Sequence, residues 1–443
     1  MKWFCAVASV LVTLLAAGTV FAAEPSDVAF VDVNTIPMDR ERVEAHQTVV
    51  VHDGTIVAAG PAARVRPPAS AKQVQCGGRL FLLPGLADMH THVSEETDLG
   101  LYIANGVTTI LHMGGTEQRL VGHIRGDIDR GEVVGPQMFF SLMIDGSDAF
   151  GILHVTDAEV ARAAVKVARS VGYDFLKVYN NLTPDEFAAL VDEGRRLGLP
   201  VVGHGVRAVG LPEALFLGQV MVAHAEEFLY TAFKDRRDEA RLASVVAQVK
   251  QSGAYVTPTL STYETITRDW GRPEVIASWL ALPETQTLSP TVRQRWARSF
   301  YAHRPPEDLA PELVFQRRLT LAFLRAGVPL LAGTDSPEVP GMFPGASLHA
   351  ELKALVASGF SPFEALSAAT RTPGDFIQAT HPDRQRFGVI EVGRRADLIL
   401  VEANPLQDIA ALDHLTGVLA HGRWFDQPGL EALQAERRAA YTH

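Results

Sequence analysis

Short apolar runs recur along the middle of the chain, and amphipathic helical patterns follow several of them. Alternation of apolar strands with helices is typical of parallel sheets in α/β proteins. The helical patterns cover 158–171, 183–197 and 362–369. The apolar runs predict strands at 82–87, 108–113, 137–144, 175–179, 201–203, 221–223, 254–258 and 329–332.

This spacing predicts an α/β fold, with a (β/α)8 TIM barrel over residues 82–385. An open doubly wound sheet is the alternative, but the glycine-rich turn that usually follows its first strand is absent from this sequence. The stretch 262–311 is longer than an ordinary connection. We therefore expect it to be an insertion, helical in part, that forms a lid.

Strand-like alternation of apolar and polar residues also marks both ends of the chain. The turn Asp53-Gly54 is typical of a β-hairpin. The strand-like runs are 28–33, 47–51, 54–59, 388–391, 396–401 and 418–425. These runs predict one small β-sandwich domain, formed from 23–81 and 386–430, and leave 431–443 as a C-terminal tail.

The first residues have the pattern of a secretory signal peptide. Lys2 precedes an apolar run over 3–21, and the small residues Ala22 and Ala23 follow it. The run is close to the length of a membrane span, so an uncleaved anchor is the alternative. The small residues favour cleavage after a signal peptide at 1–22, which predicts a secreted or periplasmic protein that is not in the membrane afterwards.

Composition and charge exclude several classes of protein. The chain has 443 residues, of which 47% are hydrophobic and 21% charged, as in ordinary globular proteins. Its 40 basic and 51 acidic side chains give a net charge of −11, which argues against a general nucleic-acid binder. Signal cleavage would remove Cys5 and leave Cys76 as the one thiol, so no disulfide forms within the mature chain. A homo-oligomer is compatible with all of these features.

Histidines alternate at the end of the first predicted strand of the barrel. His90 and His92 follow the apolar run 82–87, and residues two apart in a strand point to the same side. The carboxyl ends of barrel strands carry the active sites of TIM-barrel enzymes. Because neutral imidazole is a common metal ligand, this pair is a candidate metal-binding element.

Four later strands also carry or end in a potential ligand. Lys177 lies within an apolar strand, where a lysine is costly unless it is paired or chemically altered. His204 and His224 end two further strands, and Asp335 follows the last one. Strands in parallel order would bring these side chains to one face, which predicts a single polar centre at the carboxyl end of the barrel.

The sequence resembles the amidohydrolase superfamily, in particular its imidazolonepropionase-like and Xaa-Pro dipeptidase-like members. The resemblance rests on Pro-Gly-Leu-Ala-Asp-Met-His-Thr-His at 84–92, Phe-Leu-Lys-Val-Tyr at 175–179 and Ala-Gly-Thr-Asp at 332–335. Further similar segments are 203–204, 224–227, 348–352, 365–372, 393–398 and 404–406. The resemblance covers nearly the whole of the expected mature chain and is much more specific for the superfamily than for a substrate.

The resemblance implies two divalent metal ions, usually zinc. His90, His92 and Asp335 would hold the more buried metal. His204 and His224 would hold the outer one. Lys177, carbamylated by CO2, would bridge both metals. A metal-bridging hydroxide would then attack the substrate, with Asp335 as general base and acid.

The expected substrate is a small amide or peptide with an amide-like C–N bond, such as an Xaa-Pro dipeptide, another dipeptide or an N-acyl amino acid. Candidate substrate contacts are Tyr230, His154 and His112, although the loop 145–154 departs from the pattern of dipeptidase-like relatives. Two alternatives stay open. One is single-metal hydrolysis of a cyclic amide or amidine, as in imidazolonepropionase and deaminases. The other is a metal-binding scaffold without activity.

Overall fold

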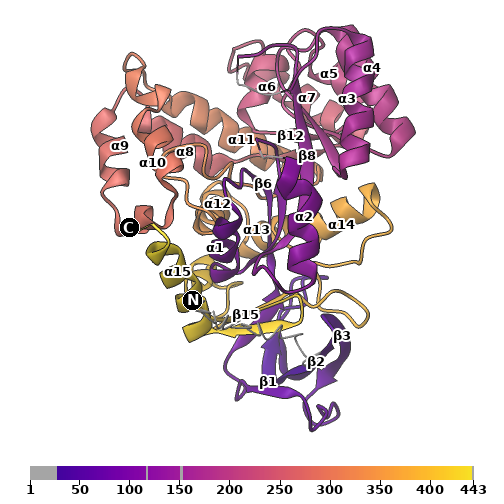
Figure 1. The fold of residues 1–443 in the computed structure, drawn as a ribbon, viewed down its shortest axis with the longest axis vertical. Coiled ribbons are helices and arrows are strands. Elements are labelled where there is room, and N and C mark those ends of the chain that lie inside the picture. The colour runs from indigo at the N-terminus through magenta and orange to yellow at the C-terminus, as the bar shows by residue number, and fades with distance from the viewer. Residues whose placement is uncertain (1–26, 116–117, 150–152, 442–443) are drawn as a thin grey trace, which may run out of the picture.

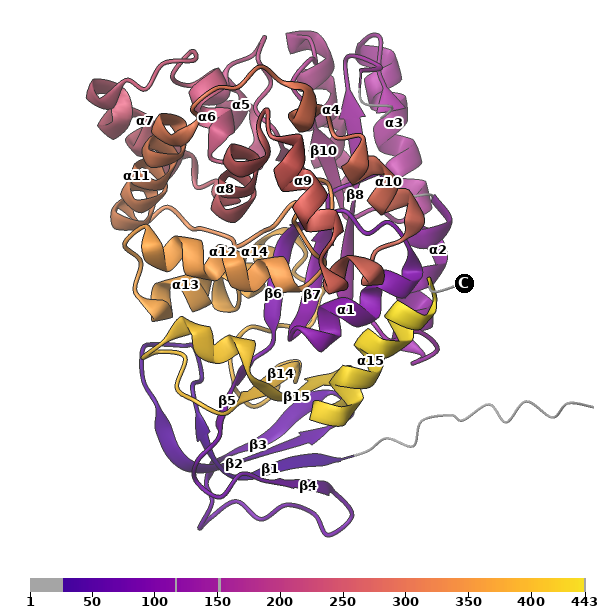
Figure 2. The same cartoon turned by 90° about the vertical axis from the view of Figure 1, so that its left-hand side faces the viewer.

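The computed structural model describes residues 27–115, 118–149 and 153–441. The predicted signal peptide at 1–22 lies outside these residues. None of the helices in the described part is both long and apolar enough to cross a membrane. Two sheets organise the chain, and in Figure 2 the sheet that contains the first strands of the chain lies at the bottom, with the second sheet above it.

The first sheet combines strands from both ends of the chain. Strand β5 lies between β1 and β14, pairing in parallel with β1 and antiparallel with β14. The turn Asp53-Gly54 joins β2 to β3 with φ of 46° and 66°, which suits a tight hairpin. The strands are β1 (Val28–Thr35), β2 (Glu44–His52), β3 (Thr55–Pro61), β4 (Lys72–Gln75), β5 (Phe81–Pro84), β14 (Leu398–Val401), β15 (Leu415–Ala420) and β16 (Arg423–Asp426).

Four of the predicted strands are wrong. The run 329–332 forms no strand and has one isolated bridge at Leu330, and the run 418–425 is divided between β15 and β16 by the turn at 421–422. The run 82–87 is not one strand, because β5 ends at Pro84 in the first sheet and β6 begins at Leu86 in the second. Gly85 separates them, and a Cβ at that residue would lie 2.2 Å from Thr108 Oγ1, so the close approach there requires glycine. The run 388–391 forms no strand either, since its residues pair with none of the strands of either sheet.

The second sheet is parallel and nearly closed. Its main strands follow one another in chain order from β6 to β13. Isolated parallel bridges join Val256 to Leu330 and Thr91 to Ser336, so the segment 330–336 lies between the two edge strands. The strands are β6 (Leu86–Thr91), β7 (Val107–His112), β8 (Gln137–Asp145), β9 (Leu153–His154), β10 (Phe175–Val178), β11 (Val201–Gly203), β12 (Gln219–Ala223) and β13 (Tyr255–Thr257).

Helices cover the outside of this parallel sheet (Figure 1). Helix α4 begins at a capping box of Thr183 and Glu186 and ends at Gly198, which has a φ of 70°. The helices outside the insertion are α1 (Leu99–Ala104), α2 (Gln118–Asp129), α3 (Ala158–Val171), α4 (Pro184–Leu197), α5 (Leu211–Leu217), α6 (Glu226–Thr231), α7 (Glu239–Ser252), α12 (Ala346–Ala357), α13 (Pro362–Ala368), α14 (Arg371–Thr380) and α15 (Gln427–Ala439).

The stretch 262–311 is largely helical, as expected from the sequence. Trp296 is fully buried there and donates a hydrogen bond from Nε1 to the Pro337 carbonyl at 2.8 Å, which ties this stretch to the segment after Asp335. Its elements are α8 (Leu260–Asp269), α9 (Pro273–Leu280), α10 (Pro290–Ala297) and the start of α11 (Ala310–Ala326), with short 3-10 turns at Pro283–Thr287 and Phe300–His303.

The last helix packs beside the start of the parallel sheet. Helix α15 includes most of the residues expected as a C-terminal tail and lies along α1 (Figure 2). Its buried Arg437 forms an ion pair with buried Asp98 and donates a hydrogen bond to Thr97. Since these residues belong to the loop after β6, the C-terminal helix holds the loop that follows His92.

Candidate metal centre

All six predicted ligands lie at the carboxyl edge of the parallel sheet. His90 is in β6 and His92 follows it, while Lys177 is in β10. His204 and His224 directly follow their strands. The sixth ligand, Asp335, lies in the segment between the two edge strands. The centre is buried, with His90 and Lys177 at 0% and 1% exposure.

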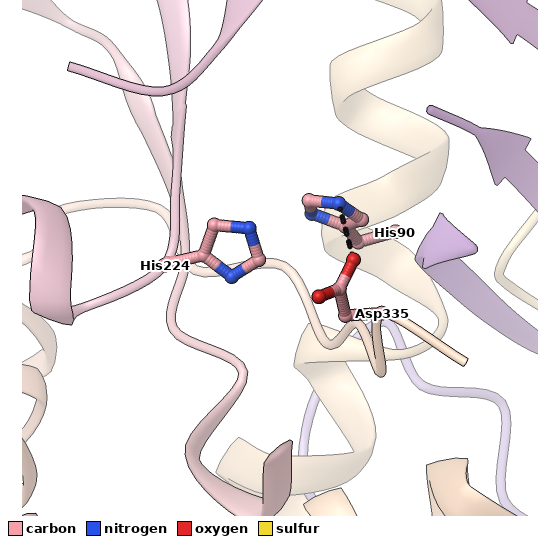
Figure 3. Close-up of side chains that lie close together, drawn as sticks. All are labelled: His90, His224 and Asp335. Carbon is pink, nitrogen blue, oxygen red and sulfur yellow. Dashed lines mark ion pairs between the residues drawn. The ribbon is translucent and has the colours of Figure 1, made fainter. Parts of the chain in front are cut away.

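The side chains of these six residues converge. One ligand atom from each of His90, His224 and Asp335 lies within 4.8 Å of the others (Figure 3). Asp335 Oδ1 is 3.1 Å from His90 Nε2 and 3.0 Å from His92 Nε2. Lys177 Nζ is 3.1 Å from His90 Nε2. The His204 ring completes the group, because its centroid is 4.8 Å from that of His224.

Two of these residues have an unusual backbone conformation. His224 has a φ of 68° and Asp335 a φ of 55°, in the left-handed region that non-glycine residues seldom adopt. Backbone hydrogen bonds hold both residues, from His224 N to the Thr257 carbonyl and from Asp335 N to the His90 carbonyl, each at 2.7 Å. Such conformations are concentrated at functional sites, where surrounding structure offsets their cost.

Outer hydrogen bonds orient three of the imidazoles. His92 donates from Nδ1 to the Gly114 carbonyl, and His204 donates from Nδ1 to Glu227 Oε1, each at 2.8 Å. His224 Nδ1 lies 2.8 Å from Thr259 Oγ1. When Nδ1 carries the proton, the Nε2 lone pair is left for the centre, and this is the usual arrangement around metal-binding histidines.

The nitrogen and oxygen atoms of this group suit a bound cation better than hydrogen bonds to one another. His90 Nε2 faces both the Lys177 amine and the Asp335 carboxylate, and one proton on Nε2 cannot serve both contacts. Burial also holds the pKa of His90, His204 and His224 well below the ordinary histidine value, so these rings are neutral. Neutral imidazoles around a carboxylate are a donor set for a divalent metal ion.

Lys177 has the environment that carbamylation needs. Burial lowers the pKa of its amine to about 8, although the nearby Asp335 carboxylate opposes this shift. A lowered pKa increases the neutral fraction of the amine, and the neutral amine is the form that adds to CO2. The product would be an anionic oxygen ligand in place of a buried cation.

Sequence reasoning missed three residues that support the ligands. Asp88 accepts hydrogen bonds from His90 N at 3.2 Å and from Thr334 N at 3.1 Å, which joins β6 to the segment 330–336. Asp88 could have been found because it points to the same side of β6 as His90. Glu227 could have been found because it follows His224 by about one helical turn, and it accepts a hydrogen bond from His204. Thr259 had no local signal, because only the fold brings it to His224.

The three candidate substrate contacts lie in different places. Tyr230 is half-buried on α6. His112 is buried behind the centre, where its Nδ1 accepts a hydrogen bond from Val93 N at 3.1 Å and its ring lies 6.2 Å from that of His92. His154 is exposed on β9, and its described contacts involve none of the six ligands. The structure therefore brings the six predicted ligands together, with His112 packed beside His92 and His154 away from them.

We expect Glu227→Gln to lower the affinity for divalent metal about tenfold or more, because a neutral amide stabilises the Nδ1–H of His204 less than a carboxylate does. Competition with a chromophoric chelator measures the affinity. Glu213→Gln, an exposed change in α5, is the matched control and should leave the affinity unchanged. Equal affinities of all three proteins would contradict the orienting role of Glu227.

A buried cluster of histidines and an aspartate at the carboxyl edge of a parallel sheet is the arrangement typical of metal-dependent α/β enzymes. Residues 81–425 match the Amidohydrolase family, and the chain belongs to that family. It is a hydrolase that acts on C–N bonds, in a family that depends on metal.

Several known proteins are similar over most of their length. Ochratoxinase from Aspergillus niger is 23% identical over 462 aligned positions, which cover 89% of this chain and 86% of the relative. The structure of bottromycin amidohydrolase matches with a TM-score of 0.75 and 25% identity, covering 95% of this chain and 92% of the other. A Xaa-Pro dipeptidase with bound methionine has a TM-score of 0.66 and 19% identity, covering 90% and 100%.

Proposed function

We propose that this chain is an exported binuclear amidohydrolase that cleaves an amide-like C–N bond of a small peptide or N-acyl amino acid. The observation that carries the proposal is the position of Lys177, whose Nζ lies 3.1 Å from His90 Nε2 inside a group of four histidines and one aspartate. A single-metal site has no use for this lysine, whereas a carbamate there supplies a ligand to two metals.

We also propose how the two sheets form domains. We take the segment 330–336 as the eighth strand of a (β/α)8 barrel and the mixed sheet as a β-sandwich domain formed from both chain ends. Export rests on the signal-peptide pattern at 1–22. The similarity to ochratoxinase, to bottromycin amidohydrolase and to a Xaa-Pro dipeptidase supports a small amide or peptide as substrate.

In the proposed reaction, bound divalent metals supply Lewis acidity for the substrate carbonyl and the attacking water. His90, His92 and Asp335 would hold one metal, and His204 and His224 the other. Asp335 Oδ1 faces two histidines, so Oδ2 is the atom that takes the proton from the attacking water. The same carboxyl then gives this proton to the leaving amine, which leaves poorly unless it is protonated.

A library assay with metal analysis tests this function. Zinc-loaded protein should contain two divalent ions per chain and release free amines from a panel of dipeptides and N-acyl amino acids. Chelation should abolish turnover, and added zinc should restore it. Fewer than two ions in active protein would refute the binuclear centre, and ammonia release from cyclic amidines without peptide cleavage would favour the single-metal alternative.

A further inference from the structure

An arginine without an acidic partner lies in the loop that follows His204. Arg207 is exposed and follows His204 by three residues. Its guanidinium carbon lies over the Tyr230 ring, 4.8 Å from the ring centroid. Within the described residues, no carboxylate lies at ion-pair distance from this guanidinium, and its N–H groups donate no hydrogen bond.

Two other arginines of the fold are neutralised by buried carboxylates. Arg125 pairs with Asp174, and Arg395 pairs with Asp397. The guanidinium of Arg207 instead keeps its N–H donors for a ligand. The planar guanidinium matches a carboxylate, which it can bind through two parallel hydrogen bonds.

Arg207 is connected to the network that orients the outer ligands. Asn180 accepts a hydrogen bond from Arg207 N at 3.1 Å, and its own Nδ2 donates to Glu227 Oε2 at 2.8 Å. Glu227 in turn accepts the Nδ1–H of His204. One residue, Asn180, therefore links the backbone of Arg207 to the carboxylate that orients His204.

We propose that Arg207 is a specificity-determining residue that binds a free carboxylate of the substrate close to the scissile bond. The inference rests on the proposed amide hydrolysis and narrows its substrates to amides with a free acid group, such as dipeptides and N-acyl amino acids. The Tyr230 ring stabilises one face of the guanidinium by a cation–π contact, so the N–H edge is held in place before the substrate arrives.

Paired substrates with and without the acid test this inference. Xaa-Pro dipeptides and N-acetyl amino acids are assayed as free acids and as C-terminal carboxamides with the zinc-loaded protein. Arg207→Gln should lower kcat/KM for the free acids about 10- to 100-fold, mostly through KM, and change the carboxamides less than about twofold. Arg207→Lys should fall between, because it keeps the charge but loses the planar fork.

Arg423→Gln is the matched control. Arg423 is also exposed and lies 4.7 Å from the Phe425 ring centroid, but it belongs to β16 of the mixed sheet. This variant should behave as the wild type with every substrate. Equal losses for acids and carboxamides in Arg207→Gln, or no loss for either, would overturn the assignment.

A binding measurement separates this inference from the proposed function. Calorimetric titration of L-proline and L-phenylalanine, each against its amide, should show preference for the free acid in the wild type and loss of that preference in Arg207→Gln. Wild-type protein that binds acids and amides equally, or binds neither, overturns the role of Arg207 even when hydrolysis is found. Preference for the acids without metal-dependent hydrolysis instead refutes the proposed function and leaves Arg207 as a carboxylate-binding residue.

Discussion

Asp335→Asn is expected to lower kcat about 10³-fold with little change in the stability of the protein. Asparagine keeps the size of the side chain and one oxygen for a metal, but its amide cannot take the proton of the attacking water. The left-handed backbone at this position, with a φ of 55°, also suits asparagine, so the change should not unfold the segment.

Asp53→Asn is a control with the same chemistry and the same backbone conformation. Asp53 has a φ of 46° in the β2–β3 turn, where Asn-Gly is as favourable as Asp-Gly. Steady-state rates with the best substrate of the panel, metal content and thermal unfolding are measured for both variants. Activity of Asp335→Asn within about tenfold of the wild type, with both metals bound, would contradict Asp335 as the proton-transfer group.

Lys177→Ala is expected to lose one of the two metals and to reduce kcat/KM about a hundredfold or more, because the ligand shared by both metals is gone. Lys177→Glu should recover part of the metal content, since a carboxylate supplies anionic oxygens as a carbamate does. Lys166→Ala, an exposed change on α3, should have no effect.

Metal analysis by mass spectrometry and carbon NMR after exposure to 13C-bicarbonate measure these changes independently of activity. The wild type should show a carbamate signal that is absent from Lys177→Ala. Two metals and full activity in Lys177→Ala would exclude a bridging role for this residue. A wild-type protein with two metals but no carbamate signal would show that the lysine contributes in another form.

The sequence was sufficient to predict where the six candidate ligands lie in the fold. His204, His224 and Asp335 each follow an apolar run. If these runs are parallel strands, the three side chains meet at the carboxyl edge of the sheet, and they lie there in the structure. The prediction worked because the carboxyl ends of parallel strands are neighbours whatever the details of packing. The family assignment agrees with the resemblance that these motifs indicated.

Other features depend on contacts between distant parts of the chain. The run 82–87 is continuously apolar because both of its halves are buried, one in each sheet, and hydrophobicity alone does not reveal the change of sheet at Gly85. The hydrogen bond between His224 and Thr259 joins residues 35 positions apart. Arg207 resembles any exposed arginine in the sequence, since only the fold shows that it lies over Tyr230.

The position of β5 between β1 and β14 has a consequence for synthesis on the ribosome. One edge of β5 can pair with β1 early, but the other edge waits for β14, which follows only after the whole parallel sheet has been synthesised. Until then its backbone N–H and C=O groups and the apolar residues Phe81, Leu82 and Leu83 are open to other chains. We therefore expect fragments that stop before residue 398 to aggregate, because the edge of β5 that β14 pairs with in the full chain stays unpaired.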